Sequence, residues 1–119
     1  MNRVRASYAL GALHSDATLQ RAARAHSSAM LRTGTFTHGD FALRMRRFGV
    51  RSSYAGENLA WGIGASASAR AIVAEWLASP AHRANLLRPG FRRIGVGRVV
   101  GTFAGYAGAA VVTADFAGS

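Results

Sequence analysis

The stretch Ile94–Phe116, IGVGRVVGTFAGYAGAAVVTADF, decides how the chain is organised. It begins and ends with the runs Ile94–Val100 and Ala109–Phe116, in which valine and other β-branched residues favour strands. The glycine-rich segment Gly101–Gly108 between the two runs predicts a turn. We therefore expect an antiparallel hairpin at the carboxyl end of the sequence.

The strongest helical pattern lies well before this hairpin. Apolar residues recur at helical spacing from about Asp16 to Thr33, with arginines elsewhere on the helix surface. Asp16 is a suitable N-cap, and Gly34 can end the helix in a left-handed conformation. Helices followed by an antiparallel hairpin are typical of a layered α+β domain.

Shorter elements fill the middle of the sequence. We expect a helix over Phe41–Phe48 that ends at Gly49, and a loop with a short strand over Ser52–Gly64. A further helix is predicted from about Ser68 to Ala78, and Ser79-Pro80 begins another helical turn. The apolar side of the Ser68–Ala78 helix is expected to face inward, with Trp76 buried; its members are Ile72, Val73, Trp76 and Leu77.

Length and composition indicate one folded domain over residues 1–119. The chain has a mass of 12.5 kDa, half of its residues are hydrophobic and 17% are charged. A domain of this size buries enough apolar surface for a stable core. A disordered chain would carry far fewer apolar residues, so that class is excluded.

The charge balance is strongly basic. All fifteen basic residues are arginine, only five carboxylates oppose them, and the formal net charge is +10. Such a surface attracts anions, and anionic envelope polymers, acidic lipids and nucleic acid are the candidate partners. A genome biased toward arginine codons would produce the same surface. Neither arginine group, 44–51 or 88–98, is interleaved with aromatic residues, so we expect no specific nucleic-acid binding.

Cysteine and long apolar runs are both absent from the sequence. The fold therefore needs no disulfide and has no thiolate metal ligand. No run approaches the roughly 18 apolar residues that a membrane span requires. Met1-Asn2-Arg3 leads directly into a helical pattern without a signal peptide, which implies either a cytoplasmic protein or an export segment removed upstream.

Three polar residues stand out as candidates for a functional site. His38 lies in the break between two predicted helices, Glu57 lies between a glycine and an asparagine, and His82 lies inside the helical turn that Pro80 begins. Neutral imidazole is a common zinc ligand, and a carboxylate can bind metal or orient a water. His26 instead falls on the apolar side of the first long helix, where we expect a core histidine.

The order of several short motifs resembles the bacterial branch of the CAP superfamily, which comprises cysteine-rich secretory proteins, antigen 5 and pathogenesis-related proteins. The resemblance covers nearly the whole chain. Its motifs are Thr37-His38, Gly56-Glu57-Asn58-Leu59-Ala60, Trp76, Ser79-Pro80-Ala81-His82-Arg83-Ala84-Asn85-Leu86-Leu87 and Ile94-Gly95-Val96-Gly97, with Asp115-Phe116 at the end.

This resemblance implies a fold and a site. The fold would be α+β, a three-layer α-β-α sandwich with a central antiparallel sheet. The family's cleft holds two histidines and two glutamates. His38 and His82 match the histidines, which would bind a divalent metal weakly, zinc above all, and Glu57 matches the first glutamate. Asn58 would hold the orientation of Glu57.

The second glutamate of the family is where this sequence departs from the pattern. The residue three positions after Trp76 is Ser79 rather than a glutamate. Glu75 lies one helical turn before Ser79 and would be either a second cleft carboxylate or a solvated surface acid. Ser79 and Glu75 are therefore counted among the residues surrounding the cleft.

Three functions follow as hypotheses. The first is a non-enzymatic, extracellular or envelope-associated module that binds a lipid, envelope or protein ligand, and that we expect to be a monomer. The second is a zinc-assisted, peptidase-like hydrolase with Glu57 as the candidate general base. The third is a basic module that binds anions by charge alone. Catalytic zinc sites usually have three protein ligands, which favours the first hypothesis over the second.

Overall fold

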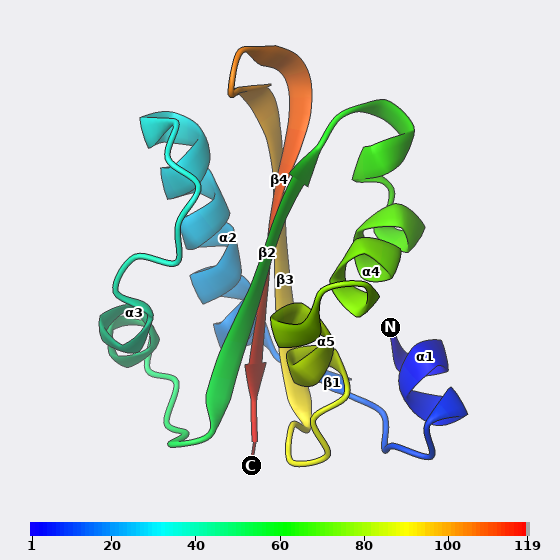
Figure 1. Cartoon of the computed structure of the whole chain (residues 1–119). Helices are drawn as coiled ribbons and strands as arrows, with labels where there is room; N and C mark the ends of the chain where they lie inside the picture. The colour runs from blue at the N-terminus through cyan, green and yellow to red at the C-terminus, as the bar shows by residue number, and fades with distance from the viewer. Residues whose placement is uncertain (119) are drawn as a thin grey trace.

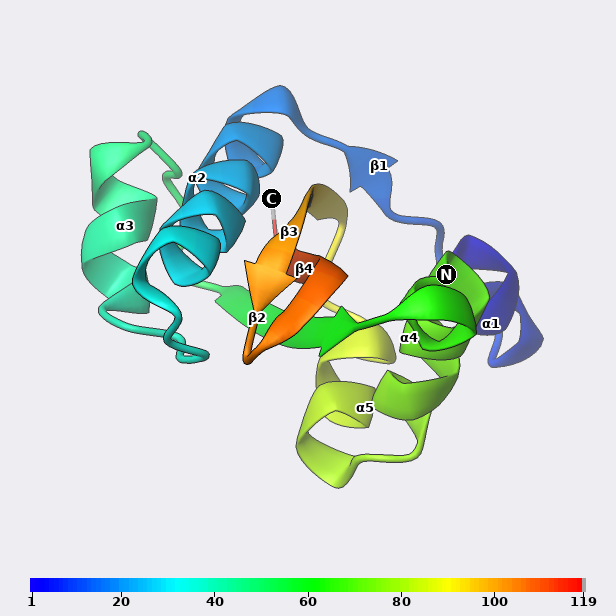
Figure 2. The same ribbon diagram turned by 90° about the horizontal axis from the view of Figure 1, so that it is seen from above.

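Helices lie on both sides of a central sheet in the computed structural model, which describes residues 1–118 (Figure 1). Helices α2 and α3 cover one face, and α1, α4 and α5 cover the other, as the view from above shows (Figure 2). Ser119, the last residue of the expected domain, lies outside the described residues. The elements in chain order are α1 (Asn2–Ser7), β1 (His14–Ser15), α2 (Ala17–Thr33), α3 (Phe41–Arg47), β2 (Ala55–Gly62), the 3-10 turn η1 (Gly64–Ala67), α4 (Ala69–Leu77), α5 (Pro80–Leu86), β3 (Arg93–Phe103) and β4 (Tyr106–Ala117).

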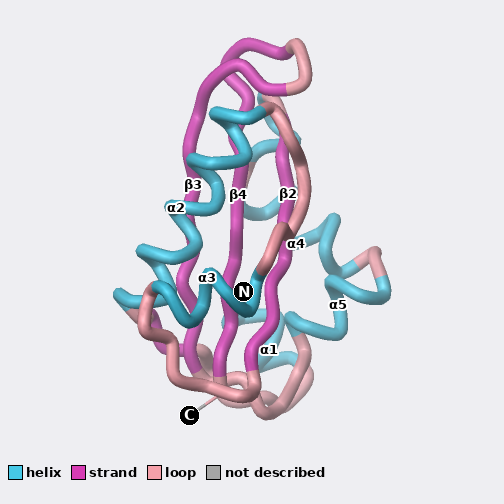
Figure 3. The backbone as a smooth tube through the Cα atoms, turned by 90° about the vertical axis from the view of Figure 1, so that its left-hand side faces the viewer, coloured by secondary structure: helices cyan, strands magenta, loops and turns pink. Residues whose placement is uncertain are grey.

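The sheet has the strand order β1-β3-β4-β2. Strands β3, β4 and β2 are antiparallel, and they run side by side behind α2 and α3 in Figure 3. The two-residue β1 adds to the edge of β3 in parallel. The expected α+β layered fold is confirmed, with an antiparallel centre and a sheet that is mixed only through β1.

The carboxyl-terminal hairpin forms as predicted, but its strands are longer and its turn is shorter. The turn consists of Ala104 and Gly105, both with positive φ angles (52° and 84°). Positive φ at both central residues gives the twist that a two-residue hairpin needs. The other glycines of the predicted turn therefore lie within the strands.

The predicted helices are also confirmed, and their ends follow the capping residues. The Asp16 carboxylate accepts a hydrogen bond from the Leu19 amide (2.9 Å), and Gly34 ends α2 with a left-handed φ of 69°. Asp40 caps α3 in the same way, by accepting from the Leu43 amide. Within the described chain, none of the helices has both the length and the apolar character to cross a membrane.

Strand β2 is the largest difference from the sequence-based expectation. An eight-residue strand replaces the predicted loop with a short strand. It pairs with β4 from Ala55↔Ala117 to Gly62↔Ala110. Its sequence, AGENLAWG, contains no β-branched residue and one aromatic residue, Trp61, so local propensity favours a strand only weakly. Pairing with β4 and burial of its centre stabilise it instead.

Helix α2 packs unusually close to β3 because two residues of that strand are glycines. A Cβ atom on Gly95 would collide with the backbone of Leu19 and Gln20, and one on Gly97 would collide with Ala23 and Arg24. The Ser27 hydroxyl also donates to the Gly97 carbonyl (3.0 Å). The glycines of Ile94-Gly95-Val96-Gly97 thus set the distance between helix and sheet.

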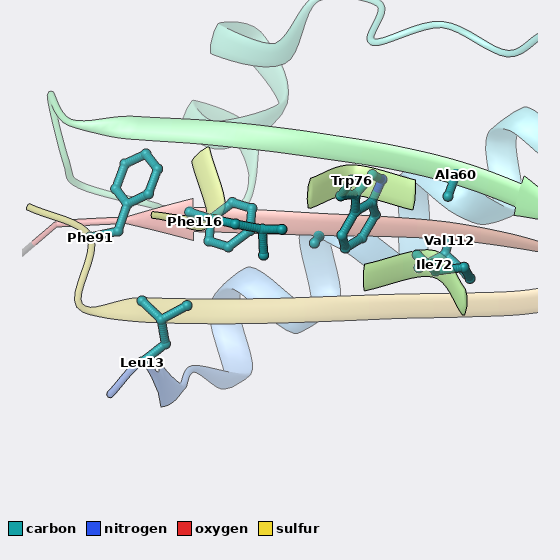
Figure 4. Close-up of a cluster of buried hydrophobic side chains, with 9 residues drawn as sticks. Leu13, Ala60, Ile72, Trp76, Phe91, Val112 and Phe116 are labelled. Atoms are coloured by element: carbon teal, nitrogen blue, oxygen red, sulfur yellow. The ribbon is translucent and has the colours of Figure 1, made fainter. Parts of the chain in front are cut away.

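The opposite face carries an aromatic core between the sheet and α4 (Figure 4). Trp76 is 2% exposed, and its indole N–H donates to the Leu59 carbonyl (2.9 Å). Phe91 stacks on Phe116 with ring centres 5.4 Å apart. The prediction that Trp76 is buried is confirmed, together with the inward face of the α4 helix.

A buried arginine, Arg5, ties α1 to the loop between α5 and β3. Its guanidinium donates to the carbonyls of Gly11, Leu86, Arg88 and Phe91. Burial lowers the pKa of Arg5, and these four acceptors satisfy the buried cation. Sequence patterns gave no sign of this contact, which joins residues about 80 positions apart.

Candidate functional site

The centre of the site is a contact between His38 and Glu57. The Nδ1 atom of His38 lies 2.8 Å from Oε1 of Glu57. The Glu57 side chain is 2% exposed and belongs to β2, whereas the His38 side chain is 53% exposed and lies between α2 and α3. A buried carboxylate that accepts from Nδ1 fixes the imidazole orientation and leaves Nε2 as its reactive nitrogen.

Arg44 of α3 binds the other oxygen of the same carboxylate. Its Nη1 and Nη2 atoms donate to Oε2 of Glu57 at 2.8 and 2.7 Å, and Nη2 also reaches the His38 carbonyl at 3.3 Å. Arg44 is not among the site residues that the sequence predicts. The helical spacing indicates that Arg44 points inward, because it lies three residues after Phe41 and four before Phe48, on the side of α3 that packs inward.

Asp115 lies directly opposite Glu57 in the pairing of β2 with β4. Its side chain is fully buried, and burial, together with the adjacent Glu57 carboxyl group, raises the pKa of Asp115 to about 9. Burial also raises the pKa of Glu57, while the adjacent Asp115 carboxyl group and the charge of Arg44 oppose that rise. The site therefore contains a second carboxyl group from β4, which the sequence resemblance did not assign.

His26 of α2 forms part of the same wall rather than part of the core. It is half-buried, and its Nε2 lies 2.7 Å from the Thr37 carbonyl. Burial lowers the pKa of His26, and the nearby charge of Arg44 lowers it further. A pocket of about 290 Å³ opens here; its polar or charged lining residues are His26, His38, Asp40, Arg44 and Arg47.

The remaining predicted site residues lie elsewhere. His82 belongs to α5, on the opposite face of the sheet from α3, where its carbonyl accepts from the Asn58 side chain (3.0 Å). Glu75 is exposed on α4, and Ser79 is half-buried just before α5. The structure therefore brings His38 and Glu57 together but places His82, Asn58, Ser79 and Glu75 outside their pocket.

The reason is the alternation of side chains along a strand. Consecutive residues of β2 point to opposite faces, so Glu57 faces α3 while Asn58 faces α5. The contact of His38 with Glu57 agrees with the expected cleft, and the position of the His82 imidazole in that cleft stays a prediction. Asn58 also differs from expectation, because it binds α5 rather than holding the orientation of Glu57.

The zinc site expected through His38 and His82 stays a prediction. No group of three or more histidine, cysteine, aspartate or glutamate side chains within residues 1–118 is placed to hold a metal ion. His38 lines the pocket between α2 and α3, His82 belongs to α5, and Arg44 already neutralises the nearest carboxylate, Glu57. Zinc binding by both histidines would require their ring nitrogens to lie within about 2 Å of one ion.

The chain is similar in sequence and fold to several bacterial proteins. The chain is 37% identical over 103 residues to the protein YkwD of Bacillus subtilis (strain 168), matching 82% of this chain and 39% of that protein. An extracellular SCP-domain protein of Bacillus anthracis superposes with a TM-score of 0.83, at 29% identity, over 99% of this chain and 37% of that one. An outer surface protein of Borrelia burgdorferi shares the fold with a TM-score of 0.79 at 24% identity, over 99% of this chain and 86% of that one.

This chain thus spans about two fifths of the length of its Bacillus relatives. The family model for CAP, the cysteine-rich secretory protein family, matches residues 1–116. The chain belongs to the CAP family, in its bacterial branch.

Proposed function

We propose that this CAP domain is a non-enzymatic binding module whose pocket beside His38 accepts an anionic group. One observation carries the proposal: His26, His38, Arg44 and Arg47 line the pocket against a single lining acid, Asp40. The negative charge of the buried Glu57 is already compensated by its ion pair with Arg44. Arg47 and His38 are exposed and so can meet the ligand.

The same chemistry suggests where the ligand comes from. Phosphate and carboxylate groups of envelope polymers, lipid headgroups and acidic protein segments are the anions that an arginine and an oriented imidazole bind. The Bacillus anthracis and Borrelia relatives are described as an extracellular protein and an outer surface protein. We place this chain at the same location, outside the cell or in its envelope, where the net charge of +10 also favours anionic partners.

A hydrolase is the second candidate, favoured by the orientation of His38. The expected general base, Glu57, is occupied at both oxygens by His38 and Arg44. A hydrolytic reaction would have to use Nε2 of His38 to activate water. The pocket lining contains no serine, threonine or cysteine nucleophile among the described residues, and residues 1–118 contain no group of three or more side chains placed to hold a metal ion. Binding without catalysis is therefore the better-supported function.

The experiment is a titration with inorganic phosphate, followed through the His38 and His26 ring signals by nuclear magnetic resonance. Arg47→Gln should weaken binding about fivefold to tenfold, which corresponds to about 1–1.4 kcal/mol. Arg70→Gln is the matched control, because Arg70 is exposed on α4 across the sheet. Equal losses in both variants would show attraction by net charge alone. Ester or peptide hydrolysis that disappears in His38→Ala would favour the hydrolase.

A further inference from the structure

Asp115 is a fully buried carboxyl group whose neighbour across the strand is another carboxyl group. It is 0% exposed, and it lies opposite Glu57, which is 7% exposed. Residues directly opposite each other on antiparallel strands place their side chains on the same face, about 5 Å apart. On its other side Asp115 lies opposite Gly95 of β3, which contributes no side chain.

Positively charged and titratable groups surround the pair, yet their hydrogen bonds go to Glu57 or elsewhere. Arg44 from α3 and His38 from the preceding loop both bind Glu57. His26 from α2 contacts the Thr37 carbonyl through Nε2. Among residues 1–118, no donor reaches either carboxylate oxygen of Asp115.

This distribution of partners decides which carboxyl group is charged. A buried carboxylate without a hydrogen bond or counter-ion is strongly unfavourable, and two adjacent carboxylates disfavour double ionisation. Two carboxyl groups can hydrogen-bond to each other only if one of them holds a proton. Glu57 has Arg44 and His38 to stabilise its negative charge, so the proton belongs on Asp115.

We propose that Asp115 carries a proton at neutral pH and donates a hydrogen bond to Glu57. The pair then bears a single negative charge, and Asp115 positions the Glu57 carboxylate for its contacts with His38 and Arg44. A carboxylate offers about four acceptor positions, and His38 and Arg44 fill three of them. The Asp115 hydroxyl fills the remaining acceptor position of the Glu57 carboxylate. The raised pKa of Asp115, about 9, agrees with this assignment.

Protonation of Asp115 makes the stability of the protein depend on pH, which can be measured without any ligand. The test is therefore independent of the proposed binding function. Near neutral pH the folded protein holds a proton on Asp115 that the unfolded chain releases, because an unperturbed aspartate ionises near pH 3.9. Stability should therefore fall as pH rises through this range. Asp115→Asn keeps a donor toward Glu57 but cannot titrate.

We expect the unfolding equilibrium constant of the wild type, relative to Asp115→Asn, to rise about tenfold per pH unit, or about a hundredfold from pH 6 to pH 8. Urea denaturation at a series of pH values provides the constants. Asp16→Asn is the control, since the pKa of Asp16 is lowered and its relative constant should not change over this range. A pH-independent ratio for Asp115→Asn would overturn the proposal.

The wild-type protein allows an independent measurement if Asp115→Asn does not fold. The carboxyl carbon signal of Asp115 should keep its protonated position throughout pH 5–8, while Glu57 reports an ionised carboxylate at pH 7. An Asp115 signal that titrates with a midpoint below pH 5 would place the charge on Asp115 and contradict the proposal. An Asp115→Leu variant that keeps the Glu57 signal unchanged would show that Asp115 does not position Glu57.

Discussion

Glu57 and Asn58 are consecutive residues of β2, yet they join opposite faces of the sheet. Glu57 contacts His38 and Arg44 on the α3 side, and Asn58 contacts the His82 carbonyl on the α5 side. The Gly-Glu-Asn motif therefore performs two tasks: the glutamate organises the candidate pocket, and the asparagine anchors a helix behind it. This separation means that variants at the two positions should have different effects.

Replacing Asn58 should change stability without changing the pocket. Asn58 is fully buried, donates to the His82 carbonyl and accepts from the Asn85 side chain (3.0 Å). Asn58→Ala leaves buried groups unpaired and should lower the free energy of unfolding by about 1–3 kcal/mol. Because Asn85 is a partner, Asn58→Ala and Asn85→Ala should be non-additive in a double-mutant cycle. Altered phosphate binding at the His38 pocket would contradict this separation.

The close approach of α2 to β3 makes Gly97 sensitive to a single methyl group. Gly97→Ala forces a Cβ into the backbone of Ala23 and Arg24, and it should cost about 3 kcal/mol of unfolding free energy. Gly11→Ala is a matched control, because a Cβ at Gly11 meets no atom within 4 Å. Its effect should stay within about 0.5 kcal/mol. Similar midpoints for the two variants in urea denaturation would argue against close helix-sheet packing.

Trp76 should contribute to the free energy of unfolding through both the volume of its side chain and the hydrogen bond of its N–H group. Trp76→Ala empties the core under α4 and should cost about 3–5 kcal/mol. Trp76→Phe retains most of the packing but loses the bond to the Leu59 carbonyl, so we expect a smaller loss of about 1–3 kcal/mol. Thermal and urea unfolding measure both. A loss under about 1 kcal/mol for the alanine variant would contradict the buried position.

The Asp16–Arg93 ion pair should give a pH-dependent contribution on the acidic side. The Leu19 amide and Arg93 lower the pKa of Asp16, so its stabilising contribution is present above the unfolded pKa and is lost as pH falls through the folded pKa. Asp16→Asn keeps an N-cap but removes the charge. We expect the wild type to be more stable by about 0.2–1 kcal/mol above pH 5, and this advantage should disappear in stronger acid. An advantage that persists at pH 2 would contradict the ion-pair origin.

Zinc binding tests whether His38 and His82 act together. His38 lines the pocket between α2 and α3, whereas His82 belongs to α5 and does not line that pocket. We expect His82→Ala to change a calorimetric zinc titration at pH 7 no more than His14→Ala does. His14 is the control because it is an exposed histidine on β1. A specific loss of zinc affinity in both His38→Ala and His82→Ala would show that the two histidines bind the same ion.

Local sequence patterns determined the helices, their ends and the hairpin. The Asp16 cap bonds an amide three residues away, and Gly34 ends α2 by its own backbone conformation. The burial of Trp76 likewise follows from helical spacing in α4. These features depend on neighbours within one or two turns of the chain, so the sequence by itself was sufficient for them. The ordered motifs also indicated the CAP family, which the comparisons confirmed.

The tertiary structure alone decided which chemical groups meet. Strand β2 exists because β4 pairs with it, and its register sets Glu57 opposite Asp115. The same register sends Asn58 toward α5, where its side chain donates to the His82 carbonyl. A shift of one residue along a strand moves a side chain to the other face, and no short-range pattern encodes that choice. Pairing energy between distant segments, summed over the whole sheet, fixes the register and with it the composition of the site.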